Sequence, residues 1–421
     1  MLKFQLGYGN TQLTFEIPKR NLCAILTPKP LTGIKDSVKA IVDSLKRPVG
    51  TPSLAELVNA NDKIAIIVSD ITRPCPTHKI LPPLLRELKK NGIRYDNVSI
   101  VFATGIHRKQ TPEEQKNLVG SNVFGKVKIF ENDAEDYQSH QTLGVTSRGT
   151  SVSIDRRLVN CDFIIGVANI EIHYYAGYTG GAKSLLPGVA SREAIQQNHS
   201  LLFQPGAQPG KADGNPVRED FEEAAKIAGL NFILNVVLND KREITGVFSG
   251  DFVKAHRAGV SQVDQMYKVP IREKADIVIA SAGGFPKDIN LYQAHKALDN
   301  AGYAVRDGGI IILVAECVDG LGSKTFEKWI MESLTPDDVI GRLRRNFVIG
   351  GHKAFYIAQL TKKAKIFLVS SLPDDVVKKA FMEPYKTIDG ALKAAFSYLG
   401  KDARITIMPY AGSTLPSEIK S

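Results

Sequence analysis

The residues that could do chemistry gather in short segments, and each segment follows an apolar run typical of a buried β-strand. These segments are 70–76 (DITRPCP), 104–108 (TGIHR), 168–184 (ANIEIHYYAGYTGGAKS) and 281–286 (SAGGFP), which leads to 292–296 (YQAHK). In parallel α/β sheets, ligands bind just beyond the carboxyl ends of the strands. We therefore predict that these segments converge on one site.

The glycine-rich segment that ends at Lys183 carries the most specific pattern. It nearly fits the phosphate-binding loop GxxxxGK[ST], but Ala182 stands where the second glycine belongs, and Pro187 interrupts the helix that should follow. We interpret the segment as a flexible loop that offers Lys183 as a nucleophilic or tethering amine beside an anionic cofactor. Burial and neighbouring cations lower the pKa of a lysine, so that its amine can attack a carbonyl. The alternative is an exposed turn with a solvated lysine.

Among the eight histidines, His107 and His173 each follow a predicted buried strand. Two imidazoles beside one substrate could take and give a proton on opposite faces, as a two-base racemase or a reversible dehydrogenation requires. His199, at the end of a predicted helix, is either a helix-cap residue or a metal ligand. Three further histidines are interpreted as ordinary surface or helix-cap residues: His78, His140 and His256.

Recognition of an acid group is the other chemistry that the sequence indicates. Arg73, between Thr72 and Pro74 at a strand end, could clamp a carboxylate through two parallel hydrogen bonds. Lys296 is either a second carboxylate anchor or an exposed helix lysine. The sequence contains no GxGxxG, GxSxG, HExxH, CxxC or EF-hand pattern. We therefore expect any metal to be held largely by something other than the protein.

Strands and helices that alternate along the chain must position these segments. Residues 2–17 predict an opening β-hairpin, and a second hairpin is predicted over 232–248. Apolar strands are predicted at 63–69, 98–103, 162–167, 276–280, 309–315, 365–369 and 404–408. Between them, helices are predicted near 77–91, from 111, at 216–228, 251–268, 290–301, 324–333, 336–345, 353–362, 373–381 and 387–399.

This alternation indicates an α/β fold of two domains with mainly parallel sheets and helices on both faces. We place the domains at residues 1–270 and 271–421, with a linker near 269–273. The first domain is expected to carry the cofactor tether and the acid/base histidines, and the last strand could pack back on it.

The composition excludes several classes of protein. With 421 residues, 43% hydrophobic and 23% charged, the chain is typical of a globular protein and not of a disordered one. No apolar run approaches the ~18–20 residues of a membrane span, and no signal peptide is expected. Four scattered cysteines suit a reducing cytoplasm. The net charge of +10 is spread along the chain without an aromatic-interleaved basic stripe, so we predict no nucleic-acid binding.

Taken together, the motifs resemble the nickel-pincer lactate racemases in order and spacing across essentially the whole chain. The motifs are DITRP at 70–74, GIHR at 105–108, HYYAGYTGGAKSLLPG at 173–188, NHS at 198–200 and YQAHK at 292–296. The resemblance implies racemisation of a short 2-hydroxy acid, D- and L-lactate first among them. It also implies two α/β domains with the active site in the cleft between them.

The cofactor that the resemblance implies is nickel bound to pyridinium-3,5-bisthiocarboxylic acid mononucleotide, which accepts a hydride and is made by dedicated cofactor-synthesis enzymes. By resemblance, Lys183 is the covalent tether, His199 is the nickel ligand, and His107 and His173 are the acid/base pair. Further cofactor contacts fall on Asp70, Thr72, Arg73, Gly180, Gly181, Ser184 and Tyr356. Substrate contacts fall on Arg73, Tyr292, Gln293 and Lys296.

The sequence departs from the family pattern in two places. Ala182 stands where the lactate enzyme has arginine, and the pair Phe355-Tyr356 stands in the region where the family has an active-site tryptophan. Three alternatives stay open: a racemase or epimerase of malate or of a longer or aromatic 2-hydroxy acid, a Schiff-base enzyme that uses Lys183, and a nucleotide- or nucleic-acid-binding module suggested only by the net charge of +10.

Overall fold

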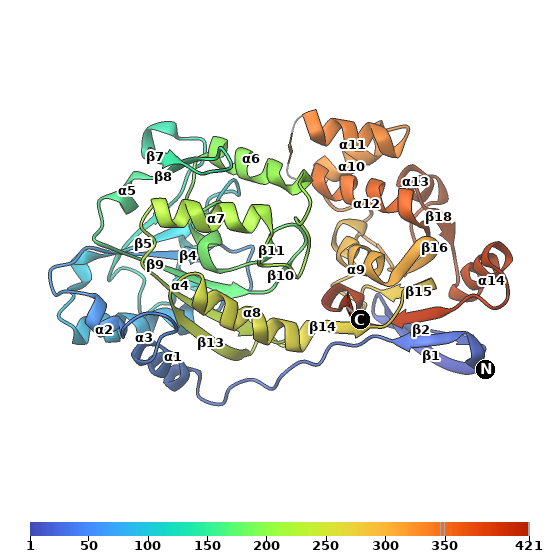
Figure 1. Ribbon diagram of the computed structural model, residues 1–421, viewed down its shortest axis with the longest axis horizontal. Helices are drawn as coiled ribbons and strands as arrows, with labels where there is room; N and C mark the ends of the chain where they lie inside the picture. The colour runs from blue at the N-terminus through green and yellow to red at the C-terminus, as the bar shows by residue number, and fades with distance from the viewer. Residues whose placement is uncertain (346, 349, 420–421) are drawn as a thin grey trace. The chain divides into compact units, whose positions relative to one another are not determined.

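The computed structural model describes residues 1–345, 347–348 and 350–419. The chain divides into two compact units (Figure 1). The N-terminal unit is Pro30–Met266, and the C-terminal unit combines Met1–Lys29 with Tyr267–Ser421. Residues 1–29, which we expected in the first domain, therefore belong to the C-terminal unit. The reason is strand pairing, because β3 (Leu22–Ile25) adds to the C-terminal sheet beside β19 (Ile405–Met408).

The N-terminal unit is built on a six-stranded sheet in the order β13-β12-β9-β4-β5-β6, in which only the edge strand β13 is antiparallel. The strands are β4 (Ile64–Ser69), β5 (Val98–Ala103), β6 (Lys128–Glu131), β9 (Phe163–Ile170), β12 (Phe232–Leu238) and β13 (Ile244–Gly250). Every residue of β4 and β9 is buried. Such continuous burial is typical of parallel strands with helices on both faces, and it confirms the predicted fold class.

The register of this sheet brings three of the chemical segments to one edge. Ser69 pairs with Ala103, and Val68 pairs with Val167, so the carboxyl ends of β4, β5 and β9 are level. The helices and short strands of this unit are α1 (Ser37–Lys46), α2 (Leu54–Leu57), α3 (Thr77–Lys90), α4 (Pro112–Val119), α5 (Arg156–Val159), α6 (Arg192–Ser200), α7 (Pro216–Ile227), α8 (Lys254–Tyr267), β7 (His140–Val145), β8 (Ser151–Asp155), β10 (Ile172–His173) and β11 (Gly177–Tyr178).

The C-terminal unit contains a second six-stranded sheet, entirely parallel, in the order β18-β17-β16-β15-β19-β3. Its remaining strands are β15 (Ala275–Ser281), β16 (Val305–Val314), β17 (Lys365–Val369) and β18 (Glu383–Tyr385). Its helices are α9 (Leu291–Ala304), α10 (Lys324–Glu332), α11 (Pro336–Arg345), α12 (Gly351–Lys363), α13 (Asp374–Lys379) and α14 (Ile388–Leu399).

The predicted opening hairpin is confirmed as β1 (Leu2–Tyr8) and β2 (Thr11–Ile17). It buries Leu6, Phe15 and Ile17 in the core of the C-terminal sheet. The predicted last strand does not pack back on the first domain, since β19 pairs with β15 and β3. Beyond it, β20 (Leu415–Glu418) pairs with β14 (Lys268–Ile271), also in the C-terminal unit. Within the described residues, no helix combines the length and apolar character needed to cross a membrane.

Candidate active site

Asp70 and His107 come together from two neighbouring strand ends. Asp70 follows β4 and is buried, and its Oδ2 lies 2.7 Å from Nδ1 of His107 in the loop after β5. Thr72 donates its hydroxyl to Oδ1 of Asp70 at 2.7 Å. Burial raises the pKa of Asp70, but the hydrogen bonds from His107 and Thr72 and the charge of Arg73 outweigh it, so the pKa is lowered overall. The carboxylate can only accept, so Nδ1 of His107 carries a hydrogen and Nε2 keeps a lone pair for a substrate proton.

The segment after β9 turns back on itself before it reaches Lys183. The short strands β10 and β11 pair His173 with Gly177. Gly180 and Gly181 then have φ values of 73° and 61°, in the left-handed region. A Cβ on Gly181 would lie 2.9 Å from the ring of His256, so only glycine fits. A 3₁₀ turn over Gly181–Ser184 follows and carries Lys183.

This glycine-rich segment is neither a flexible surface loop nor an exposed turn, which corrects the surroundings that the sequence predicted for Lys183, whereas the role of Lys183 as a tethering amine stays a prediction. Every residue from Gly177 to Ala182 is buried. Asn235 of β12 accepts the N–H of Gly181 at 2.7 Å. Ser184, an expected cofactor contact, donates its hydroxyl to the Gly181 carbonyl at 3.0 Å and so closes the turn. The packing of the segment therefore fixes the backbone of Lys183.

His173 has a different environment from His107. It is buried, and its Nδ1 accepts the backbone N–H of Ala176 at 3.3 Å, so the hydrogen of the neutral ring sits on Nε2. Burial, followed by the charges of Lys183, Arg73, His199 and Arg218, lowers the pKa of His173 well below its usual value. The two predicted bases are therefore held as opposite tautomers.

Lys183 is partly exposed as a whole residue, but its amine is buried and lies 5.9 Å from the ring centre of Phe221 on α7. Burial lowers the pKa of Lys183 well below the ordinary lysine value, and the charges of Arg73 and Arg218 lower it further. Asp70 and Glu171 act in the opposite direction but do not restore it. An amine in this state is neutral more often than a solvated lysine, and the neutral form is the nucleophile.

Arg73 and His199 complete the predicted residues of this unit. The guanidinium of Arg73 donates no hydrogen bond to any described residue, which leaves it available to a ligand. His199, near the end of α6, is buried, and its ring centre lies 5.3 Å from that of Tyr175. Among the described residues, no group of three or more His, Cys, Asp and Glu side chains could hold a metal ion. His199 is therefore not part of such a group, and its role as a metal ligand stays a prediction.

The predicted substrate residues Tyr292, Gln293 and Lys296 lie on the first turns of α9 in the C-terminal unit. Asn290 caps this helix by accepting the N–H of Gln293 at 3.0 Å. Gln293 and Lys296 are exposed, whereas Tyr292 is partly buried. Lys353 of α12 donates to the Tyr292 carbonyl at 2.5 Å, and its amine lies 3.6 Å from the centre of the Tyr292 ring.

Tyr356 lies on the same helix as Lys353. Its ring centre is 6.2 Å from that of His295 on α9. Burial, with a smaller effect of Lys296, lowers the pKa of Lys353 to about 7. The sequence analysis did not select Lys353, because a lysine at one position of an amphipathic helix carries no sign of burial.

The segment 281–286 does not behave as a ligand loop. Ser281 donates its hydroxyl to the Gly7 carbonyl at 2.7 Å, and Phe285 donates its N–H to the Gly9 carbonyl at 2.8 Å. Asp288 accepts the N–H of Gly9 at 2.7 Å. This segment therefore supports the opening hairpin, and the structure gives it a role in packing.

Two family models cover most of the chain: the lactate racemase N-terminal domain matches residues 8–210, and the lactate racemase C-terminal domain matches residues 271–415. The chain belongs to the lactate racemase family. It is 35% identical to the lactate racemase of Thermoanaerobacterium thermosaccharolyticum, over 99% of this chain and 100% of that protein. It is 34% identical to the lactate racemase of Lactiplantibacillus plantarum, over 97% of this chain and 98% of that protein.

Solved structures agree with this assignment. The lactate racemase apoprotein of T. thermosaccharolyticum superposes with a TM-score of 0.89 at 34% identity, covering 99% of this chain and 100% of that one. A protein of Thermotoga maritima has a TM-score of 0.64 at 18% identity, over 92% of this chain and 100% of that chain, which shows a shared fold. Family membership makes this chain an isomerase of the racemase class, as the resemblance predicted.

Sequence reasoning missed two residues that contact the segment leading to Lys183 in this racemase. His256, interpreted as a surface or cap residue, is fully buried and lies 2.9 Å from the Thr179 carbonyl through Nε2. Arg218 is also fully buried, and it donates to the Gly180 carbonyl at 3.0 Å. The sequence did carry one sign that Arg218 is buried. It lies on the same face of α7 as the apolar residues Phe221 and Ala225, at the spacing of three and four residues that is typical of a buried helix face.

Proposed function

We propose that this protein interconverts D- and L-lactate with a nickel-pincer nucleotide attached covalently to Lys183. The observation that carries the proposal is the grouping of a lysine of lowered pKa with two histidines held as opposite tautomers. A reactive amine suits covalent attachment, and paired imidazoles suit proton transfer in both directions. Two relatives that share about a third of the residues are named as lactate racemases.

The residues present fit such a cofactor. Arg73 and Arg218 bring positive charge to one neighbourhood, as their effects on the pKa values of His173 and Lys183 show, and this charge suits an anionic nucleotide. His199 would be the nickel ligand from the protein, and the sulfur and carbon atoms of the cofactor would hold the rest of the metal's coordination sphere. Other proposed cofactor contacts are Asp70, Thr72, Gly180, Gly181, Ser184 and Tyr356.

The chain's own residues bind the substrate and move its proton. Arg73 would clamp the carboxylate, and Tyr292, Gln293 and Lys296 are the further proposed substrate contacts. Nε2 of His107, whose Nδ1 is held by Asp70, can take the hydroxyl proton. His173, with Nε2–H in its neutral form, can donate a hydrogen bond to the oxygen of the 2-keto acid, and it can transfer a proton to that oxygen only as the imidazolium. When bound, the cofactor supplies the site that accepts and returns the hydride of the substrate's C2.

The test is to co-express the chain with the cofactor-synthesis enzymes and to measure intact mass, nickel content and racemisation of each lactate enantiomer. We expect a sulfur- and nickel-containing adduct on Lys183 and conversion of either enantiomer to the racemate. The Lys183→Ala variant should fold but carry no adduct. An adduct that persists in Lys183→Ala would overturn the tether, and racemisation by metal-free apoprotein would overturn the cofactor.

The same measurements separate the alternatives. A Schiff-base enzyme would carry a borohydride-reducible adduct on Lys183 without sulfur or nickel. Assays with malate and with longer or aromatic 2-hydroxy acids establish which substrate is preferred. We also propose that the protein works in the cytoplasm, because its four cysteines are free thiols in the structure.

A further inference from the structure

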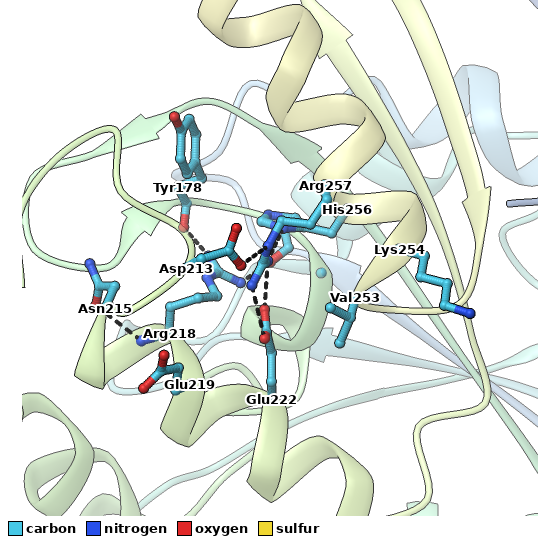
Figure 2. Close-up of polar contacts among 12 residues, drawn as sticks. Tyr178, Asp213, Asn215, Arg218, Glu219, Glu222, Val253, Lys254, His256 and Arg257 are labelled. Carbon is cyan, nitrogen blue, oxygen red and sulfur yellow. Dashed lines mark hydrogen bonds and ion pairs between the residues drawn. The ribbon is translucent and has the colours of Figure 1, made fainter. Parts of the chain in front are cut away.

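Three successive carbonyls of the segment that leads to Lys183 are held by two buried side chains. Figure 2 shows these side chains, Arg218 and His256, together with Tyr178. Arg218 of α7 donates through Nη1 to the Gly180 carbonyl at 3.0 Å and through Nη2 to the Tyr178 carbonyl. His256 of α8 donates through Nε2 to the carbonyl between them, that of Thr179, at 2.9 Å. Side chains of α7 and α8 therefore fix the backbone that precedes Lys183.

The positive charge of Arg218 is not neutralised by an ion pair. Within the described residues, no carboxylate lies at ion-pair distance from its guanidinium, and its Nε has no hydrogen-bond partner. The neighbouring acids are taken by a second arginine: Arg257 pairs with Glu222 at 2.7 Å and with Asp213 at 2.8 Å. Figure 2 shows these pairs beside Arg218. Burial lowers the pKa of Arg218 to about 10, so it stays charged at neutral pH.

The charge of Arg218 and the amine of Lys183 both lie beside the ring of Phe221, and the charge of Arg218 acts on the lysine. Cζ of Arg218 is 5.4 Å from the ring centre of Phe221, and the amine of Lys183 is 5.9 Å from the same ring centre. A buried cation without an acidic partner costs stability. The hydrogen bonds of Arg218 to two carbonyls offset only part of that destabilisation. The stability of the fold therefore does not explain why an arginine is buried at this position.

We propose that Arg218 is a positioning residue for Lys183: it holds the two carbonyls that aim the lysine, and its unpaired charge keeps the nearby amine nucleophilic. The charged groups that act on Lys183 are Arg73 and Arg218 in one direction and Asp70 and Glu171 in the other. His173 lies close enough for its own pKa to respond to Lys183. The contacts and charges in this proposal are independent of the proposed function. Only the use of the nucleophilic amine, which is to attach the cofactor, rests on it.

The test measures the amine itself in the full-length apoprotein. Trace acetylation with acetic anhydride, a small uncharged reagent, is followed at Lys183 by peptide mass spectrometry between about pH 6 and pH 11. The exposed Lys241 serves as the internal reference. Because no lactate, nickel or nucleotide is present, the result stands whether or not the chain racemises lactate.

Two variants separate charge from geometry. Arg218→Gln keeps a hydrogen-bond donor without the charge, so the half-maximal pH of Lys183 labelling should rise. For each unit of rise, labelling below that pH falls about tenfold. Arg218→Lys keeps the charge but cannot reach two carbonyls at once, so its labelling midpoint should stay nearer the wild type while attachment of the cofactor in co-expressing cells falls. The control Arg148→Gln removes a charge that is already paired with Glu219 at 2.6 Å and should change neither measurement.

A folded Arg218→Gln protein with the wild-type labelling profile would overturn the proposal. If that variant does not fold, Arg218→Met decides instead. It removes the same charge but leaves no unsatisfied polar group in the buried position, so the labelling midpoint of Lys183 should again rise. An unchanged midpoint in Arg218→Met would equally reject the electrostatic role. A wild-type level of cofactor attachment in Arg218→Lys would reject the positioning role.

Discussion

Oδ2 of Asp70 lies 2.7 Å from Nδ1 of His107, and the pairing joins the ends of two adjacent parallel strands. The carboxylate is buried and also accepts the hydroxyl of Thr72. Its position therefore selects the tautomer of His107 and the direction of its ring. Among the described residues, no carboxylate is hydrogen-bonded to the other histidine, His173, whose Nδ1 accepts a backbone N–H. The proposed acid/base pair is chemically asymmetric before any ligand binds.

Asp70→Asn should therefore impair catalysis more than folding. An amide can donate as well as accept, so it no longer selects the tautomer with a free Nε2 on His107. We expect racemisation to fall by at least ~100-fold, the scale of a lost general acid/base contribution. The control is Asp96→Asn at an exposed carboxylate that pairs with Arg94 at 3.2 Å. Equal activity of the two variants would show that Asp70 is a structural residue only.

His107→Ala and His173→Ala should each abolish most racemisation, but the two variants should keep residual activity toward opposite enantiomers. Racemisation uses both faces of the substrate, so each single variant should lose at least ~100-fold in rate. In a single turnover stopped with acid, each should still yield some 2-keto acid from the one enantiomer that the remaining histidine serves. The enantiomer should differ between the variants. Equal loss with both enantiomers would leave a single catalytic histidine.

Lys183→Met should stabilise the apoprotein near neutral pH. The folded-state pKa of Lys183 lies well below the ordinary 10.5. Between those two values the unfolded chain binds more protons, so the wild-type free energy of unfolding rises with pH in that range. The stabilisation by Lys183→Met should therefore be largest below the folded-state pKa and should disappear as the pH reaches the unfolded value. Urea unfolding at several pH values measures it, and a pH-independent difference would contradict the lowered pKa.

Arg73→Lys should cost more substrate affinity than its unchanged charge suggests. A guanidinium gives a carboxylate two parallel hydrogen bonds, whereas an ammonium acts as a point charge. The expected loss is about 1.5–3 kcal/mol, the range for a hydrogen bond to a charged group. It would be measured as a change in KM and kcat of the cofactor-loaded enzyme, with the exposed Arg94→Lys as control. Unchanged constants would assign Arg73 to the structure alone.

The sequence by itself determined the strands, the parallel sheets and the segments at their ends. Apolar runs at 63–69 and 98–103 are local patterns, and parallel pairing levels their ends, so Asp70 and His107 could be expected to meet. The short motif around Lys183 likewise indicated a reactive lysine. Each of these inferences needs only neighbours in the chain and one rule of sheet geometry.

Only the tertiary structure decided which residues surround that lysine and where the first strands belong. Arg218 and His256 reach carbonyls that are 38 and 77 positions away in the sequence. β3 pairs with a strand close to the other end of the chain. Burial of a charged or polar side chain depends on which helices pack over it, and hydropathy favours the surface for Arg and His. The charge environment that lowers the pKa of Lys183 is therefore a property of long-range packing, which no local pattern encodes.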